Sequence, residues 1–239
     1  MQFQKVCSKY NIQYVALWGT ALGTIRHSGF IPWDDDVDVA MDRSNYEKFC
    51  NVAAKEFTYP YFFQNPITDQ RYFAPLARLR NSETTAIIKG FNSLDYNNGI
   101  YIDIDILDEI APNKMQWRIQ NLLKHIALMP IKHRIPPYRV WVDLYEKVRR
   151  IYAGKNERLG ITYSFLESDL NAWISKDDFN NPIASKFEFL DIFIPGNVQQ
   201  YLARAFGEWQ RFPSKHERGA WHAGQVYFDP DVSYKEILK

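Results

Sequence analysis

The sequence predicts an α+β fold, in which strands and helices alternate around a sizeable core. Residues 36–41 and 100–107 both alternate apolar and polar side chains with period two, which is typical of half-buried strands. Other segments, before, between and after these two expected strands, have apolar residues at helical spacing. The chain has 239 residues, of which 46% are hydrophobic and 16% aromatic, so it can build one large domain with an appended subdomain.

Charge and cysteine content exclude several classes of protein. The formal net charge is only +1, so the whole chain carries no signature of a nucleic-acid-binding protein and we expect no nucleic-acid partner. Cys7 and Cys50 are too few for a disulfide framework and lack zinc-ribbon spacing. A reducing, cytoplasmic compartment is the simplest reading. No segment approaches about 20 uninterrupted apolar residues, so we expect a soluble or peripheral protein.

The first 112 residues alternate helical and strand patterns. We expect helices near residues 3–10 and 44–54, with Ser44 as N-cap and Glu47 completing a capping box. Residues 19–23 read as a turn that opens a short helix. The expected strands are short apolar or alternating runs, at residues 14–18, 36–41, 78–80, 84–88 and 100–107.

Acidic side chains occupy one face of each alternating strand. Side chains two residues apart point the same way in a strand, so Asp36 and Asp38 share one face while their apolar neighbours enter the core. The same alternation in residues 100–107 leaves Asp103 and Asp105 together. Two carboxylates on one face can share a cation.

Four aspartates fall within residues 34–38, shortly after the glycine turn that contains Gly19 and Thr20. Carboxylates this close repel one another and lose solvation when partly buried, a cost that cations offset. A divalent metal that holds a phosphate is the economical explanation. Glycine would let backbone amides of the Gly19-Thr20 turn approach that phosphate, although a plain turn is the commoner meaning of such a pair.

Residues 113–158 differ in character, because they carry eleven basic and three acidic side chains, a local balance of +8. Helical spacing is expected at residues 117–128 and 140–152, with Pro130, Pro136 and Pro137 between them. Three readings are open: solvated helix faces, docking to anionic lipid headgroups, and a cradle for a lipid-linked or phosphorylated glycan.

The remaining residues predict a helix, a strand pair, a second helix and an irregular tail. The strand pair is expected at residues 187–190 and 192–194, and the second helix at 198–206, ending near Gly207. We therefore expect a core in residues 1–112, a basic helical insertion in 113–158, and a C-terminal part, 159–239, that completes the core and covers the site.

Residues 18–41 resemble the opening motif of the LicD family, which includes bacterial phosphocholine transferases and, more distantly, fukutin-type ribitol-phosphate transferases. The similarity runs from Trp18-Gly19-Thr20 to the aspartates ending at Asp38. Further parts of the chain fit the family pattern: residues 77–80 with Thr84, residues 99–108, residues 201–202 and 206–209, Pro213, Arg218 and His222.

The resemblance implies a nucleotidyltransferase-like mixed β-sheet flanked by helices. It also implies that Asp36, Asp38 and Asp103 are catalytic residues that ligate Mg²⁺ or Mn²⁺. Asp103 either completes the metal site or takes the proton of the acceptor hydroxyl. The implied donor is CDP-choline or another CDP-alcohol, and the implied acceptor is a hydroxyl of a glycan, with a lipid-linked precursor as one candidate.

Other polar residues join this expected site. Arg26 and Arg80 are candidate phosphate contacts because a guanidinium matches phosphate oxygens, whereas the structural alternative is an ion pair with Asp34 or Asp35. Arg218 is a further candidate for substrate binding.

His222 is another candidate for contacting nucleotide or acceptor, although a lone histidine is more often structural. For Asp34 and Asp35, a supporting or turn-capping role is at least as well favoured as ligation. Asp105 stands where the family usually has an aromatic residue, and we expect it to be a solvated acid rather than an added ligand.

A choline headgroup is well bound by an aromatic cage, where each cation–π contact contributes roughly 0.5–2 kcal/mol. Tryptophans are more often core residues, so none is preferred except Trp18, which replaces a smaller family residue. The candidates are Trp18, Trp33, Trp141, Trp173 and Trp221.

The preferred function is therefore metal-dependent transfer of phosphocholine, or a related alcohol phosphate, from a CDP-linked donor to a cell-surface glycan or its precursor, with release of CMP. One alternative is a nucleotidyltransferase that moves NMP from NTP and releases pyrophosphate with the same three acids. A non-catalytic glycan-binding domain would predict loss of those acids. The expected location is the cytoplasm, with peripheral contact at the inner face of the membrane as an option.

Overall fold

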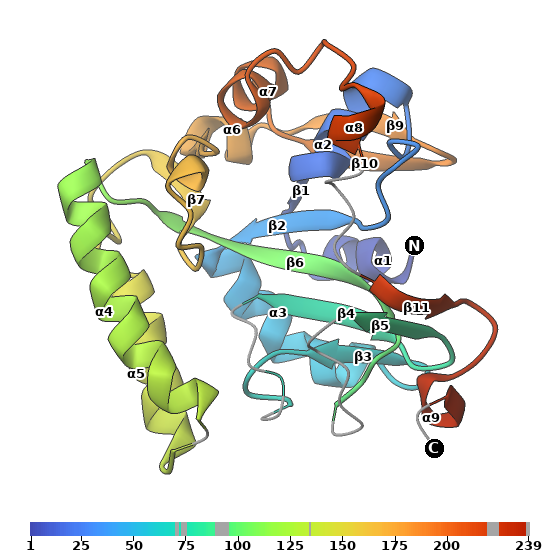
Figure 1. The fold of residues 1–239 in the computed structure, drawn as a ribbon, viewed down its shortest axis with the longest axis horizontal. Helices are drawn as coiled ribbons and strands as arrows, with labels where there is room; N and C mark the ends of the chain where they lie inside the picture. Colours follow the sequence, from blue (N-terminus) through green and yellow to red (C-terminus); the bar gives the residue numbers. More distant parts are fainter. Residues whose placement is uncertain (70–71, 73–75, 89–95, 134, 219–224, 238–239) are drawn as a thin grey trace.

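A mixed β-sheet forms the centre of the computed structural model (Figure 1). The structure describes residues 1–69, 72, 76–88, 96–133, 135–218 and 225–237. Five strands follow one another in the order β1-β2-β6-β4-β3, and β7 and β8 continue from β6. These strands are β1 (Val15–Ala16), β2 (Asp38–Asp42), β3 (Tyr61–Gln64), β4 (Ala77–Asn81), β6 (Ile100–Glu109), β7 (Arg158–Ile161) and β8 (Ile174–Ser175).

The sheet is mixed because β2 and β6 are parallel while the other neighbours are antiparallel. Strand β6 is the longest and central one: β2 and β4 flank its body, and its end pairs with β7. The expected α+β class with a mixed sheet is confirmed. β6 thereby links β2, which follows the aspartate run, to β4 and β7 of the later chain.

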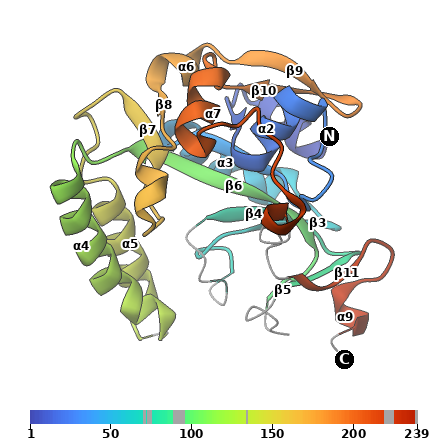
Figure 2. The ribbon, with the colours of Figure 1, turned by 45° about the horizontal axis from the view of Figure 1, so that its top comes forward.

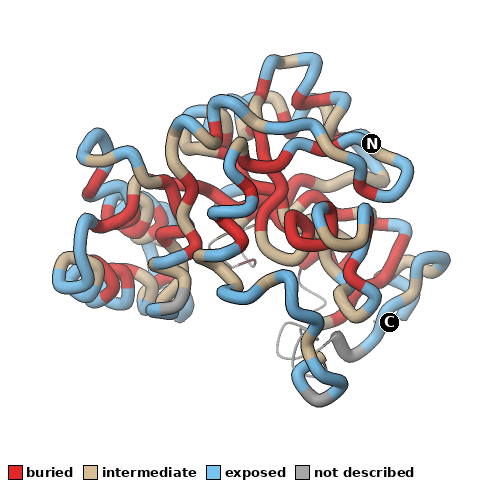
Figure 3. Tube along the Cα trace, turned by 90° about the horizontal axis from the view of Figure 1, so that it is seen from above, coloured by how far each residue is buried: buried red, intermediate tan, exposed pale blue. Residues whose placement is uncertain are grey.

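Helices cover both faces of the sheet. The apolar residues of one face, including Val39 and Ile104, pack with α1 (Gln2–Lys9) and α3 (Arg43–Glu56). The opposite face packs with α2 (Trp18–His27) and α7 (Val198–Phe206). Buried segments run through the middle of the molecule (Figure 3). Period-two alternation therefore leaves Asp38, Asp103 and Asp105 on the α2 side.

Two strand pairs lie outside the central sheet. β9 (Ile183–Phe187) and β10 (Leu190–Ile194) form an antiparallel hairpin, so the expected strand pair exists but turns a few residues earlier than predicted. β5 (Thr85–Ile88) pairs with β11 (Gln225–Asp229), a strand in the region expected to be irregular. Its partner lies far away in sequence, and no local pattern encodes that pairing.

Several short helices complete the described chain. They are the 3₁₀-helix Glu167–Leu170, α6 (Lys176–Asn180), α8 (Lys215–Arg218) and α9 (Tyr234–Ile237). Helix α7 ends at Gly207 as expected, where φ is +65°. The predicted capping box of α3 is wrong: its N-cap is Asp42, which accepts a hydrogen bond from the Asn45 backbone N–H at 2.8 Å.

The basic segment forms a pair of packed helices, α4 (Lys114–Lys132) and α5 (Tyr138–Arg149), at the outer edge of the molecule (Figure 2). Pro130 lies inside α4 rather than ending it, contrary to expectation. Proline removes one backbone hydrogen bond, but packing against α5 keeps the last turn helical.

A buried ion network attaches the helix pair to the sheet. Arg43 binds Asp108 of β6 at 2.6 Å and Glu146 of α5 at 2.5 Å. Arg149 is fully buried and donates to the same Glu146 at 2.9 Å. The position of α5 is thus fixed directly to the strand that carries Asp103.

Candidate active site

Parallel pairing of β2 and β6 places Asp38 opposite Asp103. The Asp103 backbone N–H donates to the Val37 carbonyl at 2.9 Å, which aligns the two strands at this point. Asp36 lies in the extended segment just before β2. One carboxylate oxygen of each of Asp36, Asp38 and Asp103 lies within 4.8 Å of the others. The three residues expected to form a metal site are therefore brought together from two distant segments.

Simultaneous ionisation of the carboxylates in this cluster is energetically unfavourable. Burial, followed by the charges of Asp34, Asp103 and Asp35, raises the pKa of Asp36 to about 7. Burial and the neighbouring acids also raise the pKa of Asp38 well above its ordinary value. A divalent cation would reverse both effects, because it stabilises the ionised forms.

Arg78 of β4 pairs with Asp103, with 2.6 Å between Nε and Oδ1. Its guanidinium also stacks over the Tyr101 ring at 3.9 Å. This contact follows from the antiparallel register of β4 and β6, in which Arg78 is opposite Asp103. The sequence motif around residues 77–80 contained Arg78, but only the register reveals which arginine reaches the acids.

Arg80, expected as a phosphate contact, lies one pair further along the same face, opposite Tyr101. It is fully buried and donates to the side chain of Gln64 and, at 2.7 Å, to the Gly99 carbonyl. Burial, followed by the charge of Arg78, lowers its pKa to about 10. The structure does not bring its guanidinium to the three carboxylates.

The start of α2 supports the cluster from the other side. Gly19 has no room for a side chain, because a Cβ there would lie 2.1 Å from Oδ2 of Asp34. The Thr20 hydroxyl accepts a hydrogen bond from the Asp38 backbone N–H at 2.8 Å. Residues 19–23, expected to be a turn, lie inside α2. From the start of this helix Thr20 fixes the Asp38 backbone, and Gly19 leaves space for the Asp34 side chain.

Asp105 is not the solvated acid that we expected. It is buried, and its carboxylate accepts hydrogen bonds from Tyr163 Oη at 2.6 Å and from Trp18 Nε1 at 3.1 Å. The Trp18 backbone N–H in turn donates to Tyr201 Oη at 2.9 Å. Burial still raises the pKa of Asp105 to about 7, against the opposing effect of these donors. Aromatic side chains from two segments, Trp18 of α2 and Tyr163 after β7, therefore enclose this acid beside Asp103.

Asp34 and Asp35 differ in their surroundings. Asp35 is exposed, whereas the Asp34 side chain lies against Gly19 and its backbone N–H donates to the Ile31 carbonyl at 2.9 Å. One oxygen from each of Asp34, Asp35 and Asp36 also lies within 4.8 Å of the others. Asp36 thus belongs to two groups of carboxylates.

The other expected binding residues gather around Trp33. The Arg218 guanidinium stacks over the Trp33 ring at 4.2 Å, and the Arg26 guanidinium lies 5.9 Å from the same ring. Arg26 donates to the Trp209 carbonyl at 3.0 Å rather than to an aspartate. His222 lies outside the residues that the structure describes. Two of the expected basic groups therefore lie beside the residue that precedes the aspartate run.

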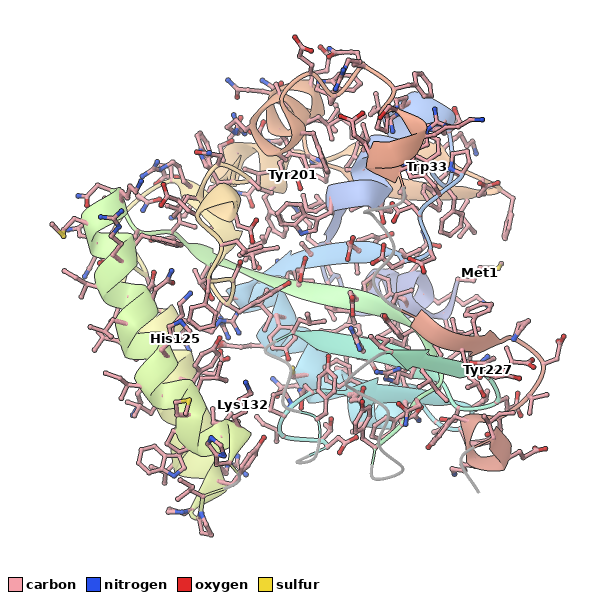
Figure 4. The ribbon with its side chains drawn as sticks, viewed as in Figure 1. Met1, Trp33, His125, Lys132, Tyr201 and Tyr227 are labelled. Atoms are coloured by element: carbon pink, nitrogen blue, oxygen red, sulfur yellow. The ribbon has the colours of Figure 1, made fainter. Side chains whose placement is uncertain are left out.

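The tryptophans fall into different environments. Trp18 contacts the acidic cluster through Asp105, and Trp33 lies between basic groups; Tyr201 and Trp33 are labelled in Figure 4. Trp141 packs in the α4–α5 pair. Trp173 lies under the Arg204 guanidinium at 3.9 Å. Trp221 is outside the described residues. Trp18 thus reaches a carboxylate by a hydrogen bond, whereas Trp33 directly precedes Asp34 in the chain.

Two comparisons with known proteins point to the same family. Residues 11–122 match the family model described as "LicD/FKTN/FKRP, nucleotidyltransferase domain". The chain is also similar to the lipopolysaccharide cholinephosphotransferase LicD of Haemophilus influenzae, with 22% identity over 259 residues that cover 94% of this chain and 92% of the relative. The matched domain contains all three clustered aspartates and Arg78.

Proposed function

Since the chain belongs to the LicD family, we propose that it transfers phosphocholine, or a related alcohol phosphate, from a CDP-linked donor to a glycan hydroxyl and releases CMP. The observation that carries the proposal is the meeting of Asp36, Asp38 and Asp103 within 4.8 Å. The similar Haemophilus protein is a cholinephosphotransferase that acts on lipopolysaccharide. We further propose a nucleotidyltransferase-like fold for this domain.

The clustered carboxylates fit a divalent cation such as Mg²⁺ or Mn²⁺. They are oxygen donors from β2, the segment before it and β6. Burial first, and the charge of neighbouring carboxylates second, raise the pKa values of Asp36 and Asp38. The chemistry supplied by a cation held there would be neutralisation of the donor's phosphate charge and stabilisation of the departing CMP.

The protein's own residues would fix the geometry of this site. Thr20 holds the backbone of Asp38, and Arg78 occupies one oxygen of Asp103. The salt bridge from Arg78 thereby fixes the orientation of the Asp103 carboxylate opposite Asp38. The open oxygens of the three aspartates would then face the phosphates of the donor.

The transfer itself is a substitution at phosphorus. The oxygen of the acceptor hydroxyl forms a bond to the phosphorus of the alcohol phosphate, and the bond between that phosphorus and the CMP oxygen breaks. CMP leaves with the electron pair of that bond, while the hydroxyl proton passes to a carboxylate of the cluster or to water. Positioning and charge stabilisation supply most of the catalysis in such reactions.

Arg218 and Trp33 are proposed to border the donor site. Their stacked arrangement offers a cation for phosphate and an aromatic face for a base or a choline headgroup. Trp18, bound to Asp105, offers a second indole beside the carboxylates. The identity of the transferred alcohol depends on such contacts.

Product analysis tests the proposal against nucleotidyl transfer, which the description of the family model also names. The protein is incubated with Mg²⁺ or Mn²⁺ and CDP-choline, CDP-ribitol, CDP-glycerol, CDP-ethanolamine or a nucleoside triphosphate, with a deacylated glycan as acceptor. CMP release that depends on the acceptor supports the proposal. Pyrophosphate release from a triphosphate, without CMP release from any CDP-alcohol, would replace it with the alternative.

Thermal shift identifies the donor before an acceptor is known. A donor that binds the folded state raises the unfolding temperature in proportion to the logarithm of its concentration. The matched variants are Asp38→Asn, in the cluster, and Glu83→Gln, at an exposed turn. The increase in unfolding temperature that requires both donor and metal is expected to vanish in Asp38→Asn and to persist in Glu83→Gln.

A further inference from the structure

Helix α4 exposes a continuous apolar stripe to solvent. Its members recur at intervals of four and three residues, so they lie on one side of the helix. Their exposed fractions are 67% for Met115, 52% for Ile119, 61% for Leu122, 60% for Ile126 and 51% for Met129. The opposite side of α4, including Ala127 and Ile131, packs against α5. An apolar stripe of this length on the surface of a water-soluble domain marks an interaction site.

Basic side chains form a row along one edge of this stripe. Arg118, His125 and Lys132 are spaced seven residues apart, and all three are exposed; His125 and Lys132 are labelled in Figure 4. At 100° per residue, this row lies immediately beside the stripe. The nineteen residues of α4 include no aspartate or glutamate. α4 itself therefore adds no acidic side chain to this face. Near the start of the helix Glu167 pairs with Lys114, and the His125 ring stacks on Phe165 at 3.9 Å.

We propose that this face of α4 docks on the surface of a bilayer that contains anionic lipids. The apolar stripe would lie at the level of the acyl chains, and the basic row would contact the headgroup phosphates. None of the described helices has the length and hydropathy to cross a bilayer. Because the stripe runs along the length of α4, the proposed contact is parallel to the membrane surface, and it holds whichever group the active site transfers.

A second copy of the chain fits the same face less well. The four-and-three spacing resembles a coiled-coil seam, which would bring two α4 helices together. The edge of that seam would then carry Arg118 and His125 without an acidic partner on α4. Leu123, 37% exposed, widens the apolar face beyond a narrow seam, and Pro130 interrupts its end. The basic row and the width of the apolar face of α4 both favour a lipid surface over a second copy of the chain.

Vesicle cosedimentation tests this proposal directly. The full chain is mixed with vesicles of phosphatidylcholine alone or of phosphatidylcholine with phosphatidylglycerol, at low and high salt. We expect binding to the anionic vesicles that weakens with salt. The variant Arg118→Gln/Lys132→Gln is expected to weaken this binding roughly tenfold or more, because each basic side chain adds to the attraction.

The apolar part is tested by Ile119→Gln/Leu122→Gln/Ile126→Gln, with Phe189→Gln as the matched control. Phe189 is 83% exposed at the β9–β10 turn, far along the chain from α4. Loss of vesicle binding in the triple variant, with unchanged circular dichroism and with binding retained in the control, supports the proposal. Equal binding by the triple variant and the wild type overturns it.

Sedimentation equilibrium tests the alternative, in which a second copy of the chain rather than a lipid surface covers the apolar stripe of α4. A wild-type dimer that the triple variant dissociates, with no binding to anionic vesicles, assigns the stripe to a second copy and overturns the lipid proposal. A monomer that binds neither vesicle type overturns it as well. Both outcomes leave the proposed transferase activity untouched, since that activity is measured with soluble donor and acceptor.

Discussion

Arg78 donates from Nε to Oδ1 of Asp103 at 2.6 Å, at the point where β4 and β6 are in register. Both side chains are about one-tenth exposed. Arg78 is thus a cation built into the edge of an otherwise acidic cluster. It pairs with one carboxylate of the cluster, whereas Asp36 and Asp38 are left to be neutralised by protons or by a bound cation.

Replacing Arg78 by Gln is expected to lower the free energy of unfolding by about 2–4 kcal/mol, because it leaves the buried Asp103 carboxylate without its partner. Urea denaturation measures the change. The double variant Arg78→Gln/Asp103→Asn removes the orphaned charge as well, so it is expected to recover part of this loss without recovering turnover. A double variant less stable than the single one would show that the pair does not act as described.

Asp38→Asn is expected to abolish turnover and to stabilise the metal-free protein. The variant removes a potential ligand, but it also removes a buried charge that its neighbours repel. Differential scanning calorimetry with and without Mg²⁺ measures both effects. The Glu83→Gln control, at an exposed turn, is expected to match the wild type. Normal activity of Asp38→Asn with Mg²⁺ would refute the assignment of this residue.

The acidic cluster itself could be predicted in part from the sequence. Period-two alternation is local, so it places Asp36 with Asp38 and Asp103 with Asp105 without knowledge of the fold. That the two strands are parallel neighbours depends on the strand order β1-β2-β6-β4-β3, which no local pattern encodes. The family resemblance implied only that the third carboxylate comes from a neighbouring strand; the parallel pairing comes from the structure.

The residues whose environment the sequence did not predict correctly are those that depend on contacts between segments distant in sequence. Arg78 and Arg80 share one face of β4, so only the register with β6 decides which of them meets Asp103. Asp105 alternates like an exposed acid, yet Trp18 and Tyr163 enclose it from α2 and from the segment after β7. In both cases tertiary pairing, not local propensity, sets the environment.

The stability of the metal-free protein is expected to fall as the pH rises from about 4 to about 7. The folded-state pKa of Asp36 is about 7, above its ordinary value of 3.8, so the folded protein holds a proton that the unfolded chain has lost. Stability that depends on this proton is present at low pH and is lost as the pH passes the folded-state pKa.

Denaturant titrations across this pH range measure the slope, with Asp36→Asn as the comparison. The variant has no ionisable group at this position, so its stability is expected to fall less steeply than that of the wild type. Saturating Mg²⁺ is expected to flatten the wild-type profile in the same way, because a bound cation lowers the pKa of its ligands. Parallel profiles for wild type and variant would contradict the assigned pKa.

Gly19→Ala is expected to lower kcat/KM by about tenfold or more, because its Cβ would lie 2.1 Å from Oδ2 of Asp34 and would displace this side chain beside Asp36. The double variant Gly19→Ala/Asp34→Ala removes the clash. If Asp34 only needs space, the double variant recovers the activity of Asp34→Ala alone. If the double variant stays as slow as Gly19→Ala while Asp34→Ala is active, the restriction at residue 19 comes instead from a close approach of substrate to the start of α2.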